Sequence, residues 1–164
     1  MMKTAGMEID VTIDEPFQGQ LEEDWLRRVA RQVLVSEGAG DDVEMGLVVT
    51  GQEQIRQLNR DYRRKDEPTD VLAFALRPEE NPPGSPPFIT PPDGQRHLGE
   101  VVVSYPQSLL QAAEQGHPVS REVATLIIHG GLHLLGYDHQ TDQQEAAMRA
   151  REAAILDQLE EAKA

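Results

Sequence analysis

HGGLHLLGYDH, residues 129–139, is the stretch around which the rest of the chain is organised, and it holds three of the chain's five histidines. An almost continuous apolar run, Val123 to Ile128, precedes it. Together the two segments predict one helix that carries His129 and His133 and ends at Gly136. Residues four apart lie on the same face of a helix, with Cβ atoms roughly 5–6 Å apart. Two imidazoles placed in this way can bind a single metal ion.

A third imidazole follows the predicted end of this helix. Gly136 can adopt the left-handed conformation that ends a helix and reverses the chain, and His139 comes shortly after it. Three neutral imidazoles with water in an open position make a common catalytic zinc site. The alternative is a buried helix whose histidines have partners in the core, but three converging imidazoles are hard to satisfy in apolar surroundings. We therefore predict one Zn²⁺ per chain, bound by His129, His133 and His139.

The same stretch resembles the signature H-G-x-L-H-L-x-G-Y-D-H of the YbeY family, bacterial metal-dependent endoribonucleases and ribosomal RNA maturation factors. Two further blocks are similar to the family, within Leu58 to Phe74 and from Leu98 to Ser104. The resemblance covers roughly residues 40–160. It implies an α+β fold, a ribonuclease activity on ribosomal RNA, and a functional arginine, Arg63, near the metal.

Length and composition restrict the class of protein. With 164 residues we expect one metallohydrolase domain over residues 1–164. There is no cysteine, so a metal site must use His, Asp or Glu. The formal net charge of −14 argues against non-specific coating of nucleic acid, because that needs a basic surface. No secretion signal and no membrane span are evident, so we expect a cytoplasmic protein without a membrane partner.

Hydrophobic periodicity predicts strands interleaved with helices. Strands are expected at residues 8–13, 43–49, 71–76 and 98–104, and helices at residues 21–35, 52–64, 105–115, about 120–135 and 141–160. The helix with the histidines is apolar on almost all sides, with Ser120 as its expected N-cap, and should be buried. We therefore predict an α+β fold in which a mixed β-sheet is flanked by helices, with a central buried metal-binding helix of zincin-like type.

Residues 77–95 contain seven of the chain's eleven prolines, which argues against regular structure there. Such a segment favours extended, polyproline-like backbone. Because it is also rich in polar residues, it can supply few core contacts. We expect a loop insertion in the domain, in preference to a site that binds a partner through its prolines.

Basic residues are concentrated at the end of the helix expected at residues 52–64. We interpret Arg60, Arg64 and Lys65 as candidates for RNA binding, with a solvated helix face as the alternative. Arg63 differs, because the resemblance to the YbeY family marks it as a catalytic residue. A guanidinium fork suits a phosphodiester and stays charged at any working pH. The positive charge that an RNA enzyme needs is therefore expected locally, within an acidic protein.

Two aromatic residues are assigned to the core from their spacing. Trp25 lies on the apolar stripe of the helix expected at residues 21–35, which favours core packing over base stacking. Tyr62 shares a helix face with Ile55 and Leu58 and is therefore expected on the inner side.

Two aspartates are candidates for orienting a ligand imidazole, Asp138 and Asp70. Asp138 can equally be a turn residue, and Asp70 can instead stabilise the turn at Pro68-Thr69. Zincin proteases carry a glutamate general base directly after the first histidine of H-E-x-x-H, and that position here is Gly130. A peptidase of that kind would lack its base.

The leading hypothesis is a zinc-dependent, single-strand-specific endoribonuclease in ribosomal RNA maturation, at the 3′ end of 16S rRNA, and in ribosome quality control. Its ribosomal substrate comes from the resemblance alone, as do expected partners among ribosomal subunits, ribosomal proteins or an assembly GTPase. One alternative is a ribosome-assembly factor whose metal is structural. Another is a hydrolase that uses the same metal on a different substrate. An open coordination position would favour an enzyme, and a fourth protein ligand would favour the structural role.

Overall fold

The structure, a computed structural model, describes residues 7–40, 42–75, 96–138 and 140–163. Four strands form a mixed sheet in the order β1-β2-β4-β3. The first three of these are parallel to one another, and β3 is antiparallel to β4. The strands are β1 (Glu8–Ile13), β2 (Val43–Thr50), β3 (Val71–Ala75) and β4 (Arg96–Ser104). The predicted α+β fold with a mixed sheet is confirmed.

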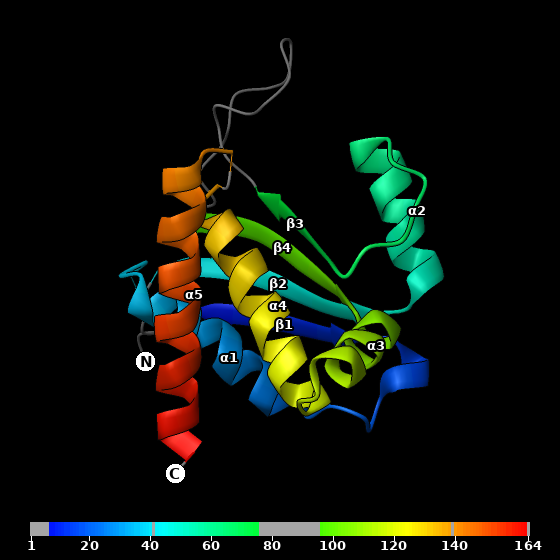
Figure 1. The fold of residues 1–164 in the computed structure, drawn as a ribbon, viewed down its shortest axis with the longest axis horizontal. Coiled ribbons are helices and arrows are strands. Elements are labelled where there is room, and N and C mark those ends of the chain that lie inside the picture. Colours follow the sequence, from blue (N-terminus) through cyan, green and yellow to red (C-terminus); the bar gives the residue numbers. More distant parts are fainter. Residues whose placement is uncertain (1–6, 41, 76–95, 139, 164) are drawn as a thin grey trace, which may run out of the picture.

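Helices cover both faces of this sheet. They are α1 (Glu23–Ser36), α2 (Gln52–Arg63), α3 (Tyr105–Gln115), α4 (Val119–Leu134) and α5 (Asp142–Lys163), with a short 3-10 helix at Glu15–Phe17. In Figure 1, α1, α4 and α5 lie together on one side, and α2 stands apart from them beyond β3. The predicted bounds are correct to within about two or three residues in the described part of the chain.

The helix that carries the histidines is the centre of the main core, as predicted. Ten of the sixteen residues of α4 are buried, with Ile127 and Leu132 fully inaccessible. Its expected N-cap was wrong, because α4 begins at Val119 with Pro118 as the N-cap residue. The fixed φ of proline suits a helix entrance, and the Pro118 carbonyl accepts from the backbone N–H of Arg121 at 3.1 Å.

Gly130 marks the closest approach of α4 to the sheet. A Cβ atom at this position would lie 2.7 Å from Cγ1 of Val101, a fully buried residue of β4. A side chain there would collide with the sheet, since a valine on a buried strand has little freedom to move. The position that carries the general base in H-E-x-x-H peptidases is therefore used here for packing.

A smaller core lies on the other face of the sheet, under α2. Ile55 packs there against Leu72 and Val102. The prediction that Tyr62 faces inward was wrong, because 70% of its surface is exposed. The physical reason is that β3 is the last strand of the described sheet. The ring of Tyr62, in the final turn of α2, contacts Phe74 of this edge strand and is otherwise largely exposed.

Two predictions reach beyond this description. The proline-rich loop expected at residues 77–95 lies outside the described residues, so a single domain with that insertion stays a prediction. Within the described ranges, no helix is long and apolar enough to cross a membrane.

Candidate active site

A cleft of about 600 Å³ opens between α4, β3 and the segments that follow α2 and α4. The structure brings His129 and His133 together with Arg63, Asp70 and Asp138 in this cleft. The other residues that line it are Thr69, Val71, Ala73, Ala75, Gly130, Gly136, Tyr137 and Gln140. Residues from three distant parts of the sequence therefore meet at one place.

The two motif histidines on α4 lie side by side. The centroids of the His129 and His133 rings are 4.7 Å apart, with an interplanar angle of 77°. The third predicted ligand, His139, lies outside the described residues. The part of the chain that the structure describes contains no group of three His, Cys, Asp or Glu residues placed to hold a metal, so the three-histidine site stays a prediction.

His129 is oriented by a carboxylate from α5. Its Nδ1 lies 2.8 Å from Oε2 of Glu152, and both side chains are largely shielded from solvent. An ionised carboxylate can only accept a hydrogen bond, so Nδ1 carries a proton, and in the neutral imidazole Nε2 is then the nitrogen with the lone pair. Histidines that bind metals are commonly held in this way. Glu152 was absent from the candidates proposed from the sequence, which were Asp138 and Asp70.

The chain reverses after α4 as predicted. Gly136 has a φ of 105°, a conformation that favours glycine. Its N–H donates to the His133 carbonyl, and the next N–H, of Tyr137, donates to the Leu132 carbonyl, both at 3.0 Å. The carbonyl groups at the end of the helix are thereby satisfied, and Tyr137 and Asp138 are turned back toward the cleft.

Tyr137 also ties this turn to α1. Its hydroxyl donates to Glu37 at 2.6 Å, and the other carboxylate oxygen of Glu37 accepts from Arg151 of α5 at 2.6 Å. The hydrogen bond to Glu37 and partial burial raise the pKa of Tyr137 above its ordinary value. The ends of α1 and α4 are therefore joined to α5 behind the cleft.

The segment between α2 and β3 places Arg63 and Asp70 at the cleft. Asn59, buried in the last turns of α2, donates from its amide to the Glu67 carbonyl at 2.8 Å. Further along, the Asp70 carbonyl accepts from the backbone N–H of Ser104 at 2.9 Å. These bonds fix both ends of the turn. The Asp70 side chain itself accepts from the Thr69 hydroxyl at 3.4 Å, which matches the turn-stabilising alternative.

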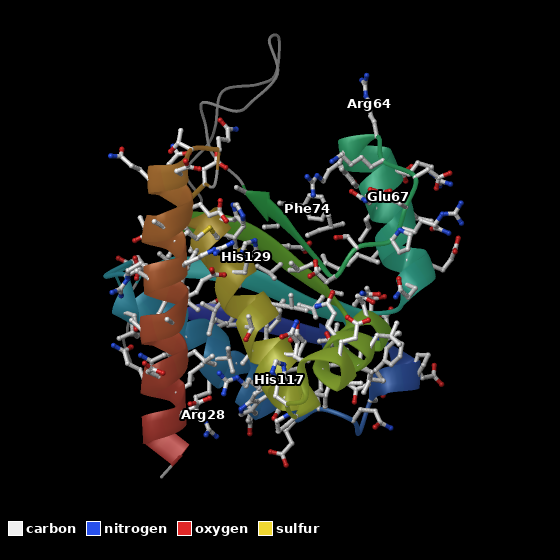
Figure 2. All side chains as sticks on the ribbon, viewed as in Figure 1. Arg28, Arg64, Glu67, Phe74, His117 and His129 are labelled. Carbon is white, nitrogen blue, oxygen red and sulfur yellow. The ribbon has the colours of Figure 1, made fainter. Side chains whose placement is uncertain are left out.

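The other basic residues predicted to bind RNA lie outside the cleft. Arg60 is half exposed and lies 3.3 Å from the Asp61 carboxylate. Arg64 ends α2 in a left-handed conformation and extends away from the body of the protein (Figure 2). Lys65 is exposed. Of the basic cluster, Arg63 alone lines the cleft.

The cleft contains the types of side chain that bind a divalent cation, although no three of them in the described residues are placed to hold one. Two imidazoles, two aspartates and one arginine line the cleft, and a further carboxylate, that of Glu152, contacts His129. Imidazole and carboxylate ligands suit zinc. Without a bound cation, the carboxylates would make the cleft repellent to a phosphodiester.

A family model described as Endoribonuclease YbeY matches residues 9–160. The chain belongs to the YbeY family. It is 45% identical over 157 residues to Endoribonuclease YbeY of Dehalococcoides mccartyi, with 94% of this chain and 98% of that protein covered. It is 38% identical over 159 residues to Endoribonuclease YbeY of Roseiflexus castenholzii, with 96% of each chain covered.

The fold has a solved counterpart. The solution structure of TM1509 from Thermotoga maritima superposes with a TM-score of 0.61 at 24% sequence identity, covering 92% of this chain and 88% of that one. At this level of identity the likeness concerns the fold alone. The family resemblance inferred from the histidine motif is confirmed, whereas the roles of individual site residues stay predictions.

Proposed function

We propose that this protein is a zinc-dependent endoribonuclease specific for single-stranded RNA. The observation that carries the proposal is that Arg63 and the histidine pair His129 and His133 line the same cleft. Relatives that share most of their length with this chain are named as endoribonucleases. We further propose that the substrate is ribosomal RNA, with maturation of the 16S 3′ end and ribosome quality control as the setting.

The metal would be held by His129, His133 and His139. In the neutral imidazole, the hydrogen bond to Glu152 favours the tautomer with the proton on Nδ1, and Nε2 would then be the nitrogen that binds the metal. When bound, zinc supplies Lewis acidity and lowers the pKa of a bound water to about 7. The predicted zincin-like role of α4, a helix that carries two histidine ligands of zinc, is part of this proposal.

Arg63 is the group that holds the scissile phosphate. Its planar fork binds two phosphate oxygens at once, and it can stabilise the negative charge that builds on them in the transition state. Its counterparts Arg60, Arg64 and Lys65 lie outside the cleft and would contact the RNA backbone at flanking positions. They would raise the affinity for RNA in a way that depends on salt concentration, and they would take no part in the cleavage step.

The test compares two arginines one turn apart on α2. Arg63→Ala should lower the rate of cleavage of a single-stranded RNA roughly 10²–10³-fold, as for the loss of one donor to a transition-state anion, while zinc content and melting temperature stay at parental values. Arg63→Lys should recover part of the rate, since an ammonium lacks the fork. Arg60→Ala is the matched control and should change affinity and its salt dependence only.

Zinc content of His129→Ala, His133→Ala and His139→Ala, measured on purified protein, tests the ligand set independently. Each variant should lose most of its zinc, because two imidazoles make a weak site. Parental cleavage by Arg63→Ala would remove this residue from the mechanism. If the zinc-loaded parent cleaves no RNA, the alternative function, a ribosome-assembly factor with a structural metal, would be favoured.

A further inference from the structure

Tyr62 is an exposed aromatic residue whose ring packs against that of Phe74. It lies in the last turn of α2 with 70% of its surface exposed. Its ring meets that of Phe74 edge to face, with centroids 5.2 Å apart and an interplanar angle of 61°. Phe74 lies on the side of β3 that faces α2 (Figure 2) and packs against the buried residues under that helix. The Tyr62 ring is therefore in contact with Phe74 on one side, while most of its surface remains exposed.

The Tyr62 ring stands beside a groove that adjoins the catalytic cleft. This groove, of about 1010 Å³, is lined by Tyr62, Phe74 and Leu58 among others. Ala73 and Ala75 line both the groove and the cleft. Strand β3, at the edge of the described sheet, therefore separates the cleft from the groove. Its side chains that line both are small alanines.

Charge differs between the two sides of β3. Arg63, the residue next to Tyr62, lines the cleft. The groove contains two carboxylates, Asp14 and Glu100, and no arginine or lysine among its lining residues in the described chain. A phosphate is attracted to Arg63 and to a cation bound in the cleft, whereas the carboxylates of the groove repel it. A neutral base with amino groups is compatible with the groove, because carboxylates accept hydrogen bonds from such groups.

We propose that Tyr62, supported by Phe74, is a stacking site for the base of a nucleotide adjacent to the phosphodiester that Arg63 holds. The inference rests on the proposed ribonuclease function and deepens it. Proteins that bind single-stranded RNA stack splayed-out bases on aromatic side chains. A base paired in a duplex cannot leave its stack to reach Tyr62, so the site selects single strands. Trp25, the only tryptophan, is partly buried against the main core and does not line the cleft or this groove.

The experiment is a double-mutant cycle between Tyr62 and each base of a short single-stranded RNA. Binding to zinc-loaded protein is measured by fluorescence anisotropy with an RNA whose backbone linkages resist cleavage, and cleavage is measured separately with unmodified RNA. Tyr62→Ala should weaken binding about 5- to 30-fold, in the lower part of the range for loss of one stacked base. Tyr62→Phe, which keeps the ring, should stay within about twofold of the parent, and Tyr62→Leu should fall between them.

An abasic nucleotide at one position of the RNA should weaken binding to the parent by the same factor. At that position Tyr62→Ala should show no additional loss, because the removed base and the removed ring are partners in one contact. Leu110→Ala, which removes an exposed apolar residue of α3, is the matched control and should bind as the parent does. Circular dichroism of Tyr62→Ala should match the parent, since the ring contributes little to the core.

The outcomes separate this inference from the proposed function. If the parent binds and cleaves RNA but Tyr62→Ala does so equally well, the stacking site is overturned and the ribonuclease stands. The same conclusion follows if the losses from Tyr62→Ala and from the abasic nucleotide multiply at every position. If the parent neither binds nor cleaves single-stranded RNA, the ribonuclease proposal fails and the stacking site fails with it.

Discussion

Glu152 offers the sharpest test of the proposed metal site, because it affects a ligand without being one. It holds His129 from α5 through a hydrogen bond of 2.8 Å to Nδ1. Removal of such a partner typically costs 10–100-fold in metal affinity. That factor corresponds to about 1.4–2.7 kcal/mol of binding free energy. Glu152→Ala should therefore bind zinc with a dissociation constant about 10–100-fold higher than the parent.

The change should also appear in stability. A metal that binds only the folded state stabilises it according to its affinity and concentration. At a fixed excess of zinc, Glu152→Ala should gain about 1.4–2.7 kcal/mol less stabilisation than the parent. For a chain of this size that is a difference of about 3–10 °C in the zinc-induced rise of the melting temperature. Without zinc the two proteins should differ little, since a partly exposed pair of this kind contributes at most about 1 kcal/mol.

Two variants act as controls for this prediction. Glu152→Gln keeps an oxygen acceptor for Nδ1 but loses the charge, so its zinc affinity should lie between those of the parent and Glu152→Ala. Glu160→Ala removes another carboxylate of α5, one that pairs with Arg121 at the far end of the helix at 3.2 Å, and should leave zinc binding unchanged. Affinity is measured by competition with a chromophoric chelator at neutral pH.

Parental zinc affinity in Glu152→Ala would refute the role assigned to this contact. An equal loss in Glu160→Ala would show that the effect is one of overall charge, since the protein already carries a formal net charge of −14. Absence of zinc binding by the parent would refute the zinc site itself, and the Glu152 contact would then be a structural ion pair.

Two further predictions concern the packing that supports the site. Gly130→Ala should lower the free energy of unfolding by about 1 kcal/mol net, because overpacking against Val101 exceeds the gain in helix propensity. Chemical denaturation measures this loss. An equal loss when Val101 is also replaced by Ala would contradict the explanation. Tyr137→Phe should cost about 1 kcal/mol at neutral pH through loss of the bond to Glu37. Because the folded-state pKa of Tyr137 is raised, this contribution is complete below the ordinary tyrosine pKa of about 10 and is lost as pH rises through the higher folded value. The stability difference between parent and Tyr137→Phe should therefore shrink above about pH 10, and a constant difference up to pH 11 or higher would contradict it.

Local pattern was sufficient to predict most of the fold. The strands are short runs rich in apolar residues, alternating with polar ones in β1, and the helices carry apolar stripes, so their bounds follow from the hydrophobic pattern and from breakers such as Gly136. The start of the last helix also follows from local pattern, since the hydroxyl of Thr141 accepts from the Gln144 N–H at 3.1 Å, a contact typical of a threonine that caps a helix. The two described histidines of the site follow from their spacing on one helix. These features depend on residues close to one another in the chain, within about one helical turn, and such local patterns can be recognised in the sequence.

Features that depend on tertiary contacts were less predictable. Glu152 is 23 residues from His129 in the sequence, and it is one of several acidic residues on α5. The sequence therefore does not indicate which of these carboxylates contacts a histidine. Tyr62 has the spacing of a core residue, but its burial depends on whether a strand lies beyond β3. The presence of Arg63 in the cleft was inferred from family resemblance and not from spacing. In each case the deciding quantity is how two elements are placed relative to one another.

The placement of α5 shows why the site depends on the whole fold. Met148 and Ile155, both buried, fix this helix against the main core. Between them, the consecutive residues Arg151 and Glu152 point to different elements, the first to Glu37 at the end of α1 and the second to His129 on α4. Packing of α5, and not the freedom of a long side chain, therefore sets where the Glu152 carboxylate lies.

The shared acceptor Glu37 extends this dependence to the end of α4. It receives Arg151 from α5 and Tyr137 from the turn that follows the motif helix. The same turn leads toward His139. Any shift of α5 would thus disturb the orientation of His129 and the reversal of the chain together. If His129 binds a metal as proposed, this support would hold its side chain in place before the metal arrives, which would reduce the free energy lost in ordering the site.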